Sequence, residues 1–237
     1  MRPGTSPNRS RPKCVPRASS KLRTGVSAKS PANCLEAGLE RIDGLSSGPE
    51  QVEKLLSFLD VLVRWNRAYN LTAVKDPLDM VPRHLLDSLA LSPWLEDGRL
   101  LDAGSGGGFP GVPLAIARPG LEVTLLDSAG KKTRFLNHVR RALELPNVEV
   151  VQARLEHYAC TEGFDAVVSR AFSDLAAFAA AARHLVAGAT RLYAMKGRYP
   201  EPELQALPAW VKVETIEKLA VPGLQEDRHL VIMSVNA

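Results

Sequence analysis

The chain has 237 residues, a net charge of +4 and 45% hydrophobic residues, which suits one α/β domain with an appendage and a full hydrophobic core. Its three cysteines lack the close spacing of a disulfide framework or a zinc site, so we expect no metal and a reducing compartment, the cytoplasm. No apolar run approaches the length of a membrane span, and the first residues lack the apolar core of a secretory signal, so we expect no membrane association.

The positive charge is concentrated at the start of the chain. Residues 1–33 hold eight basic residues and no acidic residue, which leaves 22 basic against 26 acidic residues in the remainder. A polyanion-binding surface on the folded part must therefore be a local patch. Residues 1–48 are rich in Ser, Pro and Arg and have no hydrophobic period, so we expect a disordered basic extension. This extension has three possible roles: a transit peptide, an RNA-binding arm or an inert extension. We favour an inert extension, because its five prolines disfavour the amphipathic helix of a transit peptide.

After residue 48 the pattern predicts two helices and then strands that alternate with helices. Apolar residues recur at helical spacing over 49–69, and a second helix is expected over about 78–91. The alternation that follows predicts a parallel, doubly wound, Rossmann-like sheet. Its strands are expected near residues 99–103, 122–127, 148–152, 166–169 and 190–195, and its helices near 112–117, 131–143 and 176–185.

Two further strands are expected near residues 210–215 and 229–234. Seven strands, with one antiparallel member at the edge, are the outline of a Class I S-adenosylmethionine-dependent methyltransferase, whereas a dehydrogenase more often continues with βα units. We therefore expect one methyltransferase domain over 49–237, with N-terminal helices over 49–98 and a Rossmann-like core over 99–237.

A run of glycines follows the first predicted strand within residues 100–111, and the second strand ends in Asp127. Glycines such as Gly104 and Gly106 allow positive φ and remove the Cβ atoms that would hold a ligand off the backbone. Asp127 stands where a carboxylate can accept hydrogen bonds from both ribose hydroxyls of an adenosine. The sequence thus predicts a site for an adenosine-containing cofactor.

Two residues favour a methyl donor over a nicotinamide cofactor. Phe109 takes the place of the third glycine of a nicotinamide fingerprint, where close packing needs a tiny residue, and Asp102 before the first glycine is typical of S-adenosylmethionine enzymes. We therefore expect S-adenosylmethionine as the cofactor. After the third strand, Leu155 is expected to pack on the adenine ring and Glu156 to accept from its amino group; for Glu156 a solvated position on the next helix is the alternative.

Residues 169–172 (Ser-Arg-Ala-Phe), at the end of the fourth strand, indicate the acceptor. They lack the Asn/Asp-Pro-Pro-Tyr/Phe motif of amine and amide methylation, and Cys160 lies on the wrong side for pyrimidine C5 chemistry. What remains is an acceptor with a free lone pair, such as guanine N7, for which alignment and the field of the site suffice. Arg170 is the candidate catalytic residue in a positioning role, facing the cofactor or hydrogen-bonded to guanine O6; a plain salt bridge is the alternative.

Further polar residues are candidates for the substrate side. His84 and Asp87, one turn apart on a predicted helix, are a base with its orienter or a structural pair; because N7 chemistry needs no base, we favour a structural or cofactor-lid role. A basic cluster near the crevice mouth would suit RNA phosphates, with a solvated helix face as the alternative for its lysines. The cluster comprises Lys131, Lys132, Arg134, Lys196 and Arg228.

Eight short segments from the first predicted helix to the last strand share their order with one known family. They are residues 65–66, 69–72, 83–88, 102–111, 125–128, 169–172, 196–197 and 228–230. Together they closely resemble the glucose-inhibited division protein B family of small-subunit ribosomal RNA guanine-N7 methyltransferases. The resemblance implies cofactor contacts at Gly104, Phe109, Leu155, Glu156 and Arg170.

The same resemblance implies methylation of one guanine N7 in 16S ribosomal RNA, with S-adenosylmethionine as donor and the assembled or assembling small subunit as substrate. The basic extension departs from the family pattern. Two other functions stay open, a methyltransferase that acts on a different acceptor and a non-catalytic S-adenosylmethionine-binding protein on the ribosome. We expect a monomer, because no apolar helix is left without a place in the fold.

Overall fold

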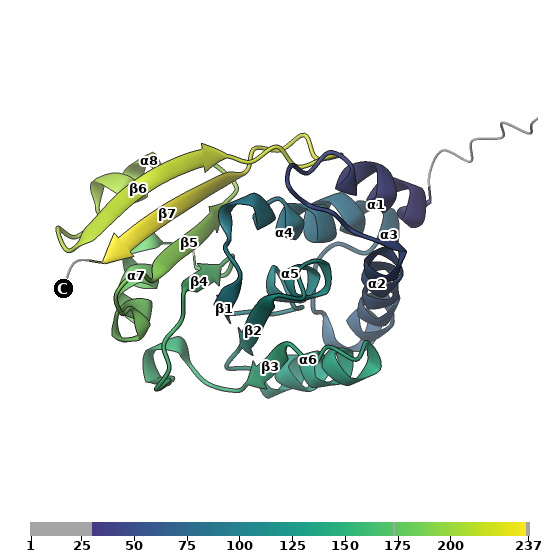
Figure 1. Ribbon diagram of the computed structural model, residues 1–237, viewed down its shortest axis with the longest axis horizontal. Coiled ribbons are helices and arrows are strands. Elements are labelled where there is room, and N and C mark those ends of the chain that lie inside the picture. The colour runs from purple at the N-terminus through teal and green to yellow at the C-terminus, as the bar shows by residue number, and fades with distance from the viewer. Residues whose placement is uncertain (1–29, 173, 236–237) are drawn as a thin grey trace, which may run out of the picture.

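The computed structural model describes residues 30–172 and 174–235 (Figure 1). The disorder predicted for residues 1–29 lies outside the described residues, but for residues 30–48 the prediction is wrong, because they contain helix α1 (Pro31–Leu39). Ser30 caps this helix by accepting a hydrogen bond from the N–H of Asn33 at 3.1 Å, and a proline occupies its first position. Leu35 of α1 is fully buried, so the helix belongs to the hydrophobic core.

Helix α1 lies against the segment that carries His84. A Cβ atom built on Gly38 would lie 2.3 Å from Cδ1 of the buried Leu86, so a larger residue has to displace that side chain. We expect Gly38→Val to lower the free energy of unfolding by about 1–3 kcal/mol, because the added side chain overpacks the contact and valine gains little helix propensity over glycine. Urea denaturation measures the loss, with Ala37→Ser on the exposed side of α1 as the control. Equal stability of the two variants would mean that α1 does not dock there.

A single mixed sheet of seven strands forms the centre of the molecule. The strands are β1 (Gly98–Ala103), β2 (Leu121–Leu126), β3 (Val148–Val151), β4 (Ala166–Ser169), β5 (Arg191–Lys196), β6 (Val211–Lys218) and β7 (His229–Val235). Their order is β3-β2-β1-β4-β5-β7-β6, and the first five are parallel. The predicted seven-stranded, Rossmann-like α/β fold is confirmed.

The last two strands differ from the prediction in one respect. β7 pairs in antiparallel fashion with both β5 and β6, so the antiparallel strand lies inside the sheet and β6 forms the edge. The burial of these strands explains the order. β7 carries a nearly continuous apolar run that is buried, whereas β6 alternates exposed and partly buried residues, as an edge strand does.

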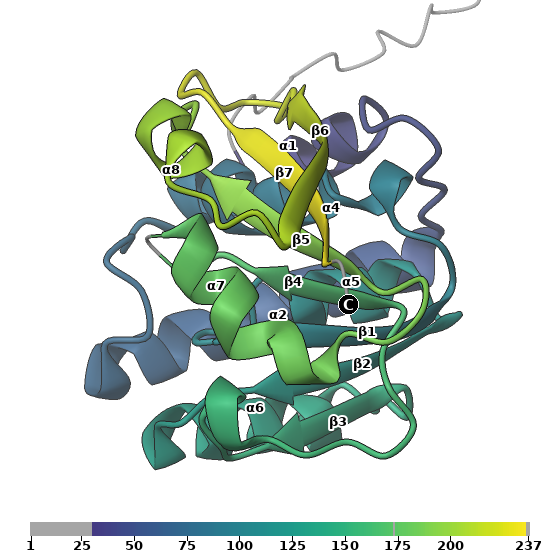
Figure 2. The ribbon, with the colours of Figure 1, turned by 90° about the vertical axis from the view of Figure 1, so that its left-hand side faces the viewer.

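Helices cover both faces of the sheet (Figure 2). Helices α2 (Pro49–Tyr69), α5 (Gly111–Ala117) and α6 (Gly130–Ala142) share one apolar core, which includes Phe58 and Phe135. On the other face α7 (Leu175–Ala182) packs over a second core. The shorter helical segments are η2 (Ser92–Trp94), η3 (Leu155–His157), η4 (Arg183–Leu185) and α8 (Glu201–Gln205), the last of which was not predicted.

The second predicted helix is present but is not a uniform α-helix. It consists of α3 (Pro77–Met80), the π-helical segment η1 (Val81–Leu86) and α4 (Asp87–Leu89). Pro82 lies in the π-helical turn, where its missing N–H removes one helical hydrogen bond. Single π turns of this kind occur often at functional sites, and this one carries Arg83 and His84 toward the carboxyl ends of the central strands.

Candidate functional site

A cleft of about 260 Å³ opens at the carboxyl ends of the first four strands. In an open α/β sheet, ligands bind at this edge, where the strand order reverses; here the reversal falls between β1 and β4. Four of the predicted cofactor residues line the cleft, namely Gly104, Asp127, Leu155 and Glu156. The remaining lining residues are Leu126, Ser128, Lys132, Ala153, Arg154, Ala171 and Phe172.

The glycine-rich loop after β1 is fixed to the neighbouring strand by backbone hydrogen bonds. The N–H of Gly104 donates to the carbonyl of Leu126 at 2.8 Å, and the N–H of Gly106 donates to Oδ2 of Asp127 at 3.0 Å. Gly104 has φ +79°, and a Cβ atom there would lie 2.7 Å from the Cβ of Ala171. The absence of a side chain therefore lets the loop from β1 meet the loop from β4 at the cleft.

The carboxylate of Asp127 is buried and already accepts three hydrogen bonds. Oδ1 accepts from the N–H of Ala129 at 2.9 Å, and Oδ2 accepts from the N–H of Gly106 and from Nζ of Lys132 at 3.1 Å. A carboxylate has about four acceptor sites, so one site is open, and Lys132, with 35% of its side chain exposed, can turn away to free another. Lys132 therefore lines the cleft and bonds to Asp127, and its predicted contact with RNA phosphates stays a prediction.

The segment after β3 supplies one apolar and one acidic residue to the cleft. Leu155 opens the short helix η3 and is buried, whereas Glu156 is exposed. Within residues 30–172 and 174–235 the carboxylate of Glu156 forms no ion pair, so it is free to accept from a ligand. This arrangement fits an adenine ring stacked on Leu155 with its amino group toward Glu156.

The sequence analysis predicts Phe109 as a cofactor contact, but Phe109 is not among the residues that line the cleft. Its ring is buried, lies 5.5 Å from the ring of Phe58 and stacks on the ring of His84 at 4.6 Å. Cζ of Arg170 lies 5.8 Å from the centre of the Phe109 ring. The phenylalanine in place of a third glycine thus fills the space between α2, η1 and the glycine-rich loop, and it supports Arg170 from one side.

His84 is held as a neutral imidazole. Its Nδ1 lies 2.9 Å from the carbonyl oxygen of Arg83, which can only accept, so Nδ1 carries the proton. Its Nε2 accepts from the hydroxyl of Thr72 at 2.7 Å. Burial, together with the nearby charge of Arg170, lowers the pKa of His84 to about 4. Both nitrogens are occupied, so His84 has a structural role in this arrangement.

The pairing of His84 with Asp87 that the sequence suggested is not formed. Asp87 is buried and instead lies between two guanidinium groups, with Nη2 of Arg170 3.2 Å from Oδ2 and Nε of Arg228 3.0 Å from Oδ1. Burial raises the pKa of Asp87, against the opposite effect of the two arginines. Arg170 and Arg228 thus form an arginine pair that is bridged by the carboxylate of Asp87.

The structure separates the five residues of the predicted basic cluster. Lys196 is 9% exposed and forms an ion pair with Glu203 at 2.7 Å, and Arg228 bonds to Asp87, so neither presents a free cation to phosphate. With Lys132 on the cofactor cleft, only Lys131 and Arg134 are exposed as predicted. Lys196 and Arg228 are thus already paired within the protein, and the binding of phosphate by the cluster stays a prediction.

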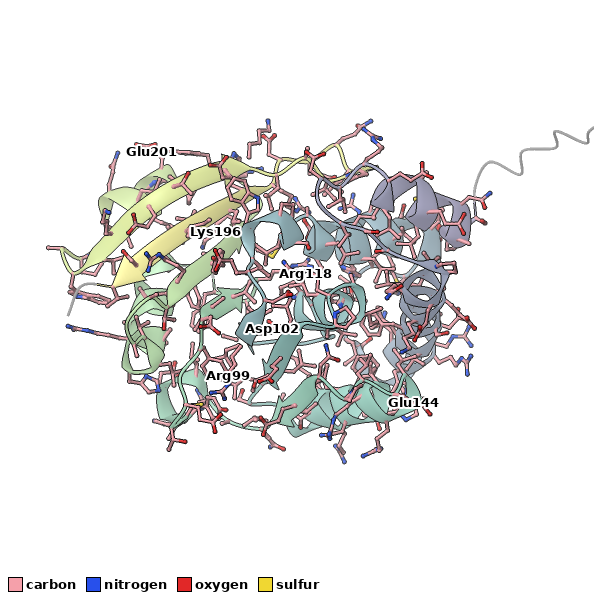
Figure 3. All side chains as sticks on the ribbon, viewed as in Figure 1. Arg99, Asp102, Arg118, Glu144, Lys196 and Glu201 are labelled. Atoms are coloured by element: carbon pink, nitrogen blue, oxygen red, sulfur yellow. The ribbon has the colours of Figure 1, made fainter. Side chains whose placement is uncertain are left out.

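Asp102 lies beneath the glycine-rich loop, in the interior of the molecule (Figure 3). Its Oδ2 accepts from the N–H of Gly111 at 2.8 Å, which ties the start of α5 to the end of β1. Oδ1 is buried and has no hydrogen-bond partner among the described residues. Burial without full hydrogen bonding raises the pKa of Asp102 to about 7.

The raised pKa of Asp102 makes stability depend on pH. The folded state holds the proton of Asp102 more tightly than the unfolded chain does. The resulting contribution to the free energy of unfolding is fully present below about pH 4, and it is lost as the pH rises through about 7. At pH 8 the loss amounts to as much as about 4 kcal/mol. Asp102→Asn should therefore gain stability relative to the wild type between pH 5 and pH 8 in urea denaturation. Parallel pH dependences of the two proteins would contradict a raised pKa.

Among the described residues, no three His, Cys, Asp or Glu side chains stand close enough to hold a metal ion. Nor does any helix in that part of the chain have the length and apolar character needed to cross a membrane.

Comparison with known proteins identifies the family. The model of the family described as rRNA small subunit methyltransferase G matches residues 51–231. The ribosomal RNA small subunit methyltransferase G of Pseudomonas aeruginosa strain UCBPP-PA14 is 53% identical over 195 residues, which cover 82% of this chain and 91% of that protein. The protein of the same name from Salmonella arizonae is 46% identical over 193 residues, covering 81% and 93%.

Solved structures with lower identity share the fold. The glycopeptide N-methyltransferase MtfA, complexed with S-adenosyl-L-methionine, aligns with a TM-score of 0.53 at 14% identity over 65% of this chain and 88% of that chain. TrmN from Thermus thermophilus aligns with a TM-score of 0.51 at 17% identity over 72% and 53%. The fold is thus that of Class I S-adenosylmethionine-dependent methyltransferases. With a family model that spans most of its length and relatives near 50% identity, this chain belongs to the rRNA small subunit methyltransferase G family.

Proposed function

We propose that this enzyme transfers the methyl group of S-adenosylmethionine to N7 of a guanine in small-subunit (16S) ribosomal RNA. The observation that carries the choice of atom is that the polar groups beside the cleft are already committed. His84 is neutral with both nitrogens bonded, and Asp87 bridges two arginines. Neither is available as a general base, and guanine N7 carries no proton that a base would have to remove.

The residues of the cleft fit the donor. The open acceptor site of Asp127 suits a ribose hydroxyl, Leu155 suits the face of adenine, and Gly104 offers backbone without a side chain where the loops from β1 and β4 meet. S-adenosylmethionine supplies an electrophilic methyl group on a sulfonium. The part of the protein is to hold the donor and to align the acceptor with its methyl group.

Arg170 is the residue that we assign to the acceptor. One of its amino groups bonds to Asp87 and lies 3.4 Å from the carbonyl oxygen of Arg83, which fixes the plane of the guanidinium group. Its other amino nitrogen, Nη1, is buried and has no hydrogen-bond partner among the described residues. An unpartnered buried donor costs stability unless a ligand completes it. Guanine O6 accepts hydrogen bonds from arginine, and a contact to O6 alone would leave the lone pair of the neighbouring N7 free for the methyl group.

The direct test is transfer of labelled methyl from S-adenosylmethionine to small ribosomal subunits that lack the modification. Digestion to nucleosides and mass spectrometry separate 7-methylguanosine from the 1-methyl and N2-methyl isomers. We expect 7-methylguanosine alone, formed by a monomeric enzyme of the cytoplasm on the assembled or assembling subunit. Label in protein or in another nucleoside would contradict the choice of acceptor. Donor binding without transfer would favour a non-catalytic role.

A further inference from the structure

One face of helix α6 carries a line of basic residues. Lys131, Arg134, His138 and Arg141 follow each other at spacings of three, four and three residues, which places them on one side of an α-helix. They span residues 131–141, a rise of about 15 Å along the helix. The arginines and the lysine are exposed, His138 is half-buried, and the whole of α6 contains no acidic residue.

Helix α2 packs against this face of α6 (Figure 1). Trp65 of α2 packs its ring 5.1 Å from the ring of His138, and Nζ of Lys131 lies 3.5 Å from the carbonyl oxygen of Tyr69. These contacts fix the position of α6 and leave its basic side chains at the surface. We define the basic stripe as Lys131, Arg134, His138 and Arg141.

The cations of the basic stripe contact backbone carbonyls but are not neutralised by acidic side chains of the described residues. In the part of the chain that the structure describes, none of its arginines or its lysine forms an ion pair. Elsewhere in that part, arginines such as Arg99 and Arg118 are paired with carboxylates. The stripe also stands out against its background, because beyond residue 33 the chain has more acidic than basic residues. A local positive surface on such a domain attracts a polyanion.

The position of the stripe connects it to the cleft. α6 begins at Gly130, directly after the loop that carries Asp127, and Lys132 on its first turn lines the cleft. The stripe therefore starts at the mouth of the cofactor cleft and continues along α6 toward Arg141. A strand whose target base reaches the methyl group of a donor held in the cleft would pass its neighbouring phosphates over this surface.

We propose that the basic stripe binds the sugar–phosphate backbone of the ribosomal RNA next to the target guanine; the proposal rests on the proposed function. Arginine suits this contact because its planar guanidinium group binds two phosphate oxygens at once. Contacts to phosphate fix the register of the RNA and carry no base specificity. The stripe thus contributes substrate affinity, and the donor cleft with Arg170 contributes the chemistry.

The test uses the full chain with Lys131, Arg134 and Arg141 all changed to Gln. We expect the KM for small subunits to rise about ten-fold or more, with kcat unchanged. The slope of log affinity against log salt concentration should fall in magnitude by about 2 to 3, since each lost phosphate contact removes about 0.7 to 0.9. The matched control changes Arg41, Arg183 and Arg191 to Gln; these lie outside α6 and likewise form no ion pair among the described residues, and the change should leave both quantities unchanged.

Two further measurements make each outcome decisive. Donor affinity and thermal unfolding of the triple variant show whether it is folded, and Arg141→Gln alone, at the exposed end of α6, provides a milder variant with a slope change of about 1. Hydroxyl-radical footprinting at saturating enzyme should show the loss of ribose protections next to the target. Unchanged KM and salt slope would overturn the proposal, as would weaker binding with an intact ribose footprint, which would indicate a protein contact. Failure of the proposed function is distinguishable, because it would appear as a different methylated nucleoside with the wild-type enzyme.

Discussion

Replacing Arg170 with Ala should lower kcat/KM for small subunits by about 100-fold or more, the loss expected when a fixed donor to a reacting group is removed. The stability of the variant should fall much less, because Asp87 retains its bond to Arg228. Methyl transfer under single-turnover conditions and urea denaturation measure the two effects separately.

Arg228→Ala is the matched control for this experiment. Both arginines bond to Asp87 and are similarly buried, with 25% and 19% of their side chains exposed. If Arg170 acts on the acceptor, its removal should reduce activity far more than the removal of Arg228 at a similar cost in stability. Equal losses of activity and stability in the two variants would assign Arg170 to a purely structural salt bridge.

Gly106→Val should weaken the binding of S-adenosylmethionine at least about 100-fold, or about 2.7 kcal/mol. Gly106 has φ +56°, and a Cβ atom there would meet no protein atom closer than 3.8 Å, so the space beside it is open to a ligand. A valine side chain would fill that space. Calorimetric titration with the donor measures the change.

The control for Gly106→Val is Gly163→Val. Gly163 has φ +72° and an open surrounding, so valine there meets the same backbone strain of about 1–3 kcal/mol far from the glycine-rich loop. Both variants should lose similar stability, but only the first should lose donor affinity. Donor affinity retained in Gly106→Val would show that the cofactor does not approach this part of the loop.

The residues predicted to hold the cofactor could be found from the sequence because each lies at or just after the end of a predicted strand. The glycines after β1, the carboxylate at the end of β2 and the residues after β3 each follow a strand, and parallel strands end at one edge of a sheet. The structure accordingly brings Gly104, Asp127, Leu155 and Glu156 together at one cleft. The sequence predicts Phe109 as a cofactor contact, whereas in the structure its ring packs against Phe58 of α2, a contact that depends on tertiary structure.

The residues on the predicted substrate side could be placed less well from the sequence, because their contacts join distant parts of the chain. Asp87 and Arg228 are 141 residues apart, and no periodic pattern links them. A sequence can show that Lys196 and Arg228 are basic, but not that Glu203 and Asp87 neutralise them. By contrast, α1 had a readable local signal in its Ser-Pro start, which the basic composition around it obscured.

The central claim is that methyl transfer here needs alignment but no removal of a proton. The measurement that tests it most directly is the single-turnover rate of transfer to small subunits from pH 6 to 8.5 with saturating donor. If no proton has to be removed, the rate should be independent of pH over this range. A His84 base with a pKa near 4 would also give a flat profile, so His84→Gln is measured beside the wild type and should retain its rate within about ten-fold. Asp102→Asn, run in parallel, separates any effect of the buried carboxyl, whose pKa is raised to about 7. A ten-fold rise in rate per pH unit in wild type and Asp102→Asn, or a loss of about 100-fold or more in His84→Gln, would reveal a general base and contradict the account.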